Sequence, residues 1–81
     1  MPETGMYDHG FMANIRVQFG LRVKERREEL GYSQRAFGAK IGMSHSYVGD
    51  VEVGRRNVSL ETIARLAEGL GVSVGELMRD L

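Results

Sequence analysis

Four serines in this chain stand where helices would begin, and they constrain its fold more than any other feature. Each serine follows an apolar residue and has a second apolar residue four positions further on. A serine in this place accepts a hydrogen bond from a backbone N–H of the first helical turn, while the two apolar side chains pack together. The pattern therefore predicts four short helices, each starting directly after its serine. The sets are Tyr32-Ser33 with Phe37, Met43-Ser44 with Val48, Val58-Ser59 with Ile63, and Val72-Ser73 with Leu77, where Glu76 adds a capping box.

Glycines and one further apolar stripe complete this layout. Glycine adopts the left-handed backbone conformation that ends many helices, and the chain offers Gly31, Gly42, Gly54 and Gly71 at suitable places. Before the first serine, one more helix would carry a stripe formed by Phe19, Val23 and Leu30. We therefore expect an all-α domain of five helices, at about 17–30, 34–41, 45–53, 60–70 and 74–80.

Composition excludes several classes of protein. The 81 residues, 42% of them hydrophobic, suit one small domain with one core. Without cysteine there is neither a disulfide nor a thiolate metal site. His9 and His45 lack the spacing of metal ligands and the glycines form no phosphate loop, so we expect no metal, cofactor or small-molecule ligand. No apolar run resembles a membrane span or a signal peptide, so we expect a cytoplasmic protein without membrane contact.

Charge is balanced overall but unevenly distributed. The chain has 11 basic and 11 acidic residues. Residues 15–57 hold nine lysines and arginines against five acidic residues, net +4, whereas residues 1–14 and 58–81 are each net −2. We expect an anionic partner to meet the middle of the chain. Residues 1–14, with Gly5 and Gly10 and mixed polarity, resemble a flexible arm, which leaves 15–81 as the folded domain.

The helices expected at 34–41 and 45–53 are joined only by Gly42, Met43 and Ser44. A short connection with a glycine is typical of a helix-turn-helix, whose second helix enters the DNA major groove. The loop after that second helix, Gly54-Arg55-Arg56-Asn57, is short and basic.

With these residues in place, the chain resembles the lambda-repressor-like and Cro-like regulators of the XRE helix-turn-helix family over about Gly20 to Met78. The chain departs from the family at Gly38, Gly49 and Val58. The resemblance implies a five-helix DNA-binding domain that regulates transcription. It is carried by Arg27, Ser33-Gln34, Ala39-Lys40-Ile41-Gly42, Tyr47-Val48, Glu52, Gly54-Arg55-Arg56-Asn57, Ser59-Leu60-Glu61-Thr62 and Leu70-Gly71-Val72.

The resemblance places base contacts at His45, Ser46 and Asp50. Histidine can donate to guanine, serine pairs with several bases, and aspartate accepts from cytosine N4. Two alternatives remain open: His45 contacts phosphate, or Asp50 only pairs with Arg55 or Arg56.

Phosphate contacts are expected around this second helix. Gln34 resembles the family's phosphate-gripping glutamine, at a helix start that also offers free N–H groups. Arg55, Arg56 and Asn57 would add affinity without sequence information. Arg35, Lys40 and Tyr47 are weaker candidates, and packing is the alternative for Tyr47.

Arg27 and Glu52 both fall on core-facing positions of their helices. An unpaired buried charge is very costly, so we expect a buried ion pair between them, which the resemblance also implies.

The final helix carries Val74, Met78 and Leu81 in one apolar stripe, together with Leu77. Val74, Met78 and Leu81 provide more apolar side chains than the small core behind this helix obviously needs. We therefore expect a homodimer through this helix, bound to double-stranded DNA at a near-palindromic operator. The alternative for the three residues is closing the monomer core.

These features indicate a regulator rather than an enzyme. Ser44, His45 and Ser46 fan out around one helical turn and cannot converge as nucleophile and base. Stand-alone domains of this kind resemble restriction-modification controllers, small phage repressors and autoregulators. The alternative function is an antitoxin or another interaction module whose main partner is a protein.

Overall fold

The computed structural model describes residues 11–81, and all regular structure in that part of the chain is helical. The helices are α2 (Phe11–Glu29), α3 (Gln34–Ile41), α4 (His45–Glu52), α5 (Leu60–Leu70) and α6 (Val74–Leu77). The expected all-α fold with five helices is thus confirmed. None of the described helices is both long enough and apolar enough to cross a membrane.

The helix starts follow the serine pattern. The four serine hydroxyls accept hydrogen bonds from the backbone N–H three residues later, at 2.9–3.1 Å. Ser73 and Glu76 form the expected capping box. The backbone is left-handed at all four glycines expected to follow helices, and α3 and α5 have the predicted bounds.

Four boundaries differ from the prediction, the smallest difference being that α4 ends at Glu52 rather than at 53. Helix α2 begins at Phe11 rather than at 17, because residues 11–16 contain no proline or glycine; residues 11–14 therefore belong to the helix and not to an arm. The remainder of the predicted arm, residues 1–10, lies outside the described residues. Leu30 follows the end of α2 in a turn and is 40% exposed, so it leaves the predicted stripe. Helix α6 ends at Leu77 rather than at 80, and Asp80 has a φ of 63°.

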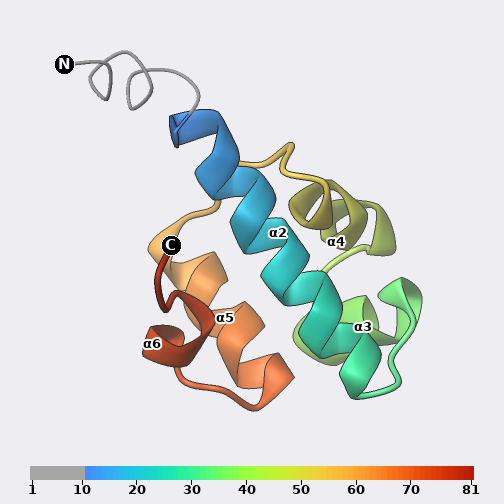
Figure 1. Cartoon of the computed structure of the whole chain (residues 1–81). Helices are drawn as coiled ribbons and strands as arrows, with labels where there is room; N and C mark the ends of the chain where they lie inside the picture. Colours follow the sequence, from blue (N-terminus) through green and yellow to red (C-terminus); the bar gives the residue numbers. More distant parts are fainter. Residues whose placement is uncertain (1–10) are drawn as a thin grey trace, which may run out of the picture.

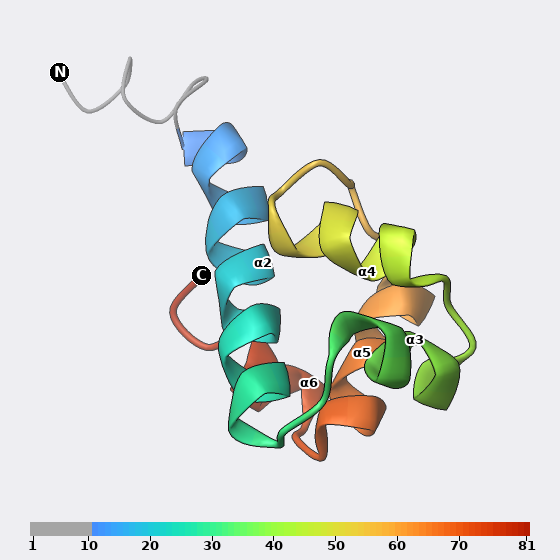
Figure 2. The same ribbon diagram turned by 90° about the vertical axis from the view of Figure 1, so that its right-hand side faces the viewer.

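Helix α2 is the central element of the fold. Figure 1 shows it running diagonally, with α3 and α4 on one side and α5 and α6 on the other. In the view of Figure 2, α3 and α4 again lie on one side of α2, and the first turns of α2 extend beyond the other helices. The core draws residues from all five helices: Phe19, Val23, Phe37, Ile41, Val48, Val51, Ile63, Leu66, Ala67, Leu70 and Leu77.

Two arginines of α2 close the ends of the last two helices. Arg26 Nε donates to the Leu70 carbonyl at the end of α5, and Arg22 Nη1 donates to the Leu77 carbonyl at the end of α6, both at 3.1 Å. Carbonyls at a helix end have no partner within the helix, and a positive charge is favourable there. These two bonds therefore hold α5 and α6 against α2.

A glycine permits the close approach of α2 to α4. Gly20 is buried, and a Cβ atom there would collide with the carbonyl oxygens of Val51 and Glu52. Gly49, on α4, differs: a Cβ there would lie 3.5 Å from the side-chain amide of Gln34, which is ordinary contact.

We expect opposite results from alanine at these two positions. Gly20→Ala should lower the free energy of unfolding by about 1–3 kcal/mol, because the added methyl forces two backbones apart. Gly49→Ala should raise it by about 0.5–1 kcal/mol, because alanine favours a helix interior over glycine. Urea unfolding measures both, and equal effects of the two substitutions would contradict the close crossing.

Candidate nucleic-acid interface

Helices α3 and α4 form the helix-turn-helix, and α4 has distinct inner and outer faces. Val48, Val51 and Glu52 are buried on the inner face. His45 and Ser46 lie in the first turn and are exposed. The structure thus places two of the three proposed base-contacting residues on the outer face, at the end of the helix that reaches base edges in this motif.

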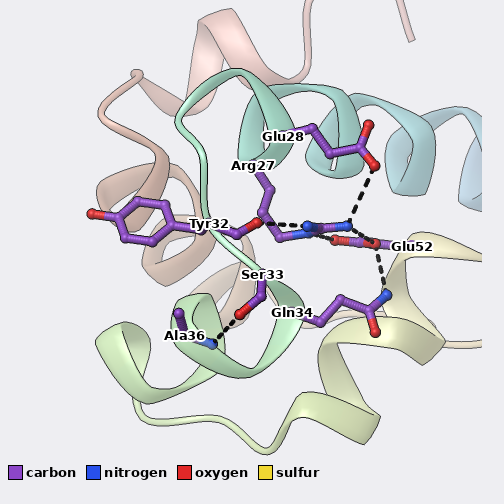
Figure 3. Close-up of polar contacts among 7 residues, drawn as sticks. All are labelled: Arg27, Glu28, Tyr32, Ser33, Gln34, Ala36 and Glu52. Atoms are coloured by element: carbon purple, nitrogen blue, oxygen red, sulfur yellow. Dashed lines mark hydrogen bonds and ion pairs between the residues drawn. The ribbon is translucent and has the colours of Figure 1, made fainter.

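Arg27 and Glu52 form a buried ion pair that joins α2 to α4 (Figure 3). Arg27 Nε donates to Glu52 Oε2 at 2.6 Å, and Nη2 donates to Oε1 at 3.0 Å. The remaining Nη1 donates to the Tyr32 carbonyl at 2.7 Å. The two side chains are 8% and 1% exposed. The hydrogen bond to Glu52 raises the pKa of the Arg27 guanidinium above its ordinary value, so burial does not neutralise it.

Gln34 extends this pair to a third helix, a contact that the sequence analysis missed. Its Nε2 donates to Glu52 Oε1 at 3.0 Å, as Figure 3 shows. A side-chain amide has two N–H groups, so the bond to Glu52 leaves one for a phosphate oxygen. The buried pair therefore orients the residue that we expect to grip the DNA backbone. The signal that could have indicated the contact between Gln34 and Glu52 is a polar residue at the start of one helix together with an acidic residue on the core-facing side of the next.

The loop arginines are gathered beside Asp50. Arg55 Nη1 lies 3.5 Å from Asp50 Oδ1, and Arg56 Nη2 lies 3.3 Å from Oδ2. Tyr47 is half-buried against the core, and the Arg56 Cζ lies 5.1 Å from the centre of its ring. In the free protein, Asp50 therefore pairs with the loop arginines and Tyr47 packs against the core, which are the alternative roles considered for these two residues.

The other phosphate candidates divide by position. Arg35 and Asn57 are exposed, at the start of α3 and in the loop after α4. Lys40 instead donates to the Tyr32 hydroxyl at 2.9 Å, at the end of α3. Arg16 of α2 was not predicted, yet it is exposed and lines the same shallow pocket as Arg56 and Asn57. The exposed basic residues beside the loop after α4 therefore include one from α2. The composition of the loop alone could not indicate this.

The three residues expected at a dimer contact also divide. Val74 faces outward and is 44% exposed. Met78 and Leu81 are half-buried and pack against the core, so they contribute to the monomer rather than exceeding its needs. The reason is the early end of α6: the chain turns after Leu77, and the Leu81 N–H donates to the Met78 carbonyl at 3.2 Å.

Comparisons with known proteins point to one kind of domain. A family model described as helix-turn-helix matches residues 23–77. The chain is 37% identical to control protein C.MunI of Mycoplasma sp over 71 residues, which cover 86% of this chain and 96% of that protein. It is 35% identical to control protein C.BamHI of Bacillus amyloliquefaciens over 66 residues, covering 80% and 82%. The crystal structure of the restriction-modification controller protein C.AhdI from Aeromonas hydrophila has 43% identity and a TM-score of 0.77, covering 86% of this chain and 97% of that one.

The buried pair should dominate the stability of the helix-turn-helix. Glu52→Ala leaves Arg27 buried without its partner and should lower the free energy of unfolding by roughly 3–5 kcal/mol. The double variant Arg27→Met/Glu52→Leu should recover most of that loss, because no charge is then buried. Both are measured by urea unfolding. A Glu52→Ala midpoint equal to that of the wild type would show that the pair contributes nothing.

Proposed function

Since the chain belongs to the XRE-type helix-turn-helix family of DNA-binding transcription regulators, we propose that it binds a specific, near-palindromic operator as a homodimer. In this proposal α4 lies in the major groove, where His45 and Ser46 contact base edges and Asp50 accepts from cytosine N4.

The observation that carries the proposal is the arrangement around α4. Its first turn exposes His45 and Ser46, with the start of α3 on one side and the basic loop on the other. Groups that suit phosphate thus flank groups that suit base edges. This is what a helix needs in order to be held by the backbone while it reads the groove. The flanking groups are Gln34, Arg35, Arg55, Arg56 and Asn57.

The homodimer is proposed through the surface around α6. Val74 presents an exposed apolar side chain there, and the bonds from Arg22 and Arg26 hold α5 and α6 against α2. Residues 58–81 are net −2, so this surface suits the side that faces away from DNA. A two-fold contact would place the two recognition helices about 34 Å apart, as half-sites one helical turn apart require.

Within this function, we propose control of a restriction-modification system. The support is the similarity to C.AhdI, a restriction-modification controller protein, 97% of whose chain is covered. C.MunI and C.BamHI are likewise named control proteins. Selection of bound duplexes from a random pool would define the operator. Failure to enrich any sequence would contradict specific recognition.

Base and phosphate contacts should separate by mutation. Arg56→Ala should weaken binding to all duplexes alike and reduce the slope of log affinity against log salt by about one. His45→Ala and Ser46→Ala should instead change which duplex is preferred. Gel shifts at several salt concentrations measure both effects. A change of preference with Arg56→Ala and none with His45→Ala would reverse the two roles.

The dimer contact is best tested at Val74, because Met78 also packs against the core. Val74→Asp should give a folded monomer with much weaker operator binding, since the second half-site no longer contributes. Leu21→Asp adds the same charge at a similarly exposed position on α2 and should stay dimeric. Sedimentation measures both. A wild type that is monomeric at tens of micromolar, or a dimeric Val74→Asp, would contradict this contact.

A further inference from the structure

Asp50 joins the two parts of the proposed interface. One carboxylate faces both loop arginines, each oxygen lying 3.3–3.5 Å from a different guanidinium. The Asp50 side chain is 30% exposed, against 76% for Arg55 and 51% for Arg56. The acid therefore sits back against α4, and the arginines fold over it from the solvent side.

Two further contacts hold this cluster in place. The Arg55 backbone N–H donates to the Asp50 carbonyl at 2.9 Å, so the loop is bonded to Asp50 through backbone as well as side chain. The Arg56 guanidinium also lies over the Tyr47 ring. The arginines are thus already directed toward an internal anion before any DNA arrives.

We infer that Asp50 determines specificity by competing with DNA phosphates for Arg55 and Arg56. This inference rests on the proposed DNA-binding function. Carboxylate and phosphate oxygens both suit a guanidinium. Each arginine turns one nitrogen toward Asp50, and a phosphate competes with Asp50 for its charge and orientation, so an arginine that swings fully to the backbone leaves Asp50. The released carboxylate then faces the groove and needs a new donor.

The sequence of the duplex decides whether Asp50 finds that donor. A cytosine N4 amino group opposite Asp50 supplies one. On any other sequence, two outcomes are open to Asp50. Either the released carboxylate faces base acceptors and its charge is left uncompensated, or it keeps its arginines and their phosphate contacts are lost. Asp50 therefore weakens binding to wrong sequences more than it strengthens binding to the right one, which is discrimination through rejection.

The test compares Asp50→Asn with the wild type on two duplexes, one enriched by the wild type from a random pool and one of scrambled sequence. On the scrambled duplex, affinity should rise about threefold to tenfold, since exposed ion pairs restrain each arginine only modestly. The ratio of affinities for the enriched and scrambled duplexes should fall by about tenfold or more. Glu68→Gln, the same loss of charge at an exposed site on α5, should leave the ratio unchanged.

A double-mutant cycle separates competition from simple repulsion. In an Arg55→Gln/Arg56→Gln background, Asp50→Asn should no longer raise affinity for the scrambled duplex. If the rise persists there, Asp50 acts by repelling phosphate directly and the inference is overturned. Thermal unfolding verifies that each variant folds, and Asp50→Ala, with higher helix propensity, replaces Asp50→Asn if it does not.

The results of these experiments distinguish a failure of the role inferred for Asp50 from a failure of the proposed DNA-binding function. An unchanged affinity ratio in Asp50→Asn overturns the role of Asp50 and leaves DNA binding intact. A wild type that binds neither duplex, even at low salt, overturns the proposed function and this inference together.

Discussion

The buried pair of Arg27 and Glu52 is the interaction on which the rest of this domain depends. The arginine belongs to α2 and the glutamate to α4. Hydrogen bonds to the Tyr32 carbonyl and from Gln34 connect the pair to the part of the chain between these two helices. A bidentate guanidinium–carboxylate contact fixes orientation as well as distance. The angle at which α4 is presented is therefore set by hydrogen-bond geometry in addition to apolar packing, which is less directional.

The arginines of this chain perform two tasks that follow from their position. Three arginines of α2 turn inward, unlike the exposed Arg16: Arg22 and Arg26 bind carbonyls at helix ends, and Arg27 binds an acid. Arg55 and Arg56, which follow α4, turn outward. They pair with Asp50 and remain exposed to solvent. The inward set stabilises the fold and the outward set stays exposed to solvent, so net charge alone does not show which arginines an anionic partner could reach.

Much of the fold could be predicted from sequence because its signals are local. A serine cap, an apolar pair five residues apart and a left-handed glycine each act within one or two turns of a helix end, and α3 and α5 have the bounds so predicted. The start of α2 and the end of α6 lacked such signals and were misplaced. Contacts such as Gln34 with Glu52, or Arg26 with the end of α5, join residues 18 and 44 positions apart. Their geometry depends on how the helices pack, which periodicity does not reveal.

The division of α4 into a buried and an exposed face bears on how such a domain changes its target over evolutionary time. Val48, Val51 and Glu52 are committed to the interior, whereas His45 and Ser46 project into solvent. Substitutions at those two outer positions leave the interior intact, so under the proposed base contacts a new operator preference can arise without passing through an unfolded intermediate sequence. Asp50 is less free to vary, because its replacement would also release two arginines.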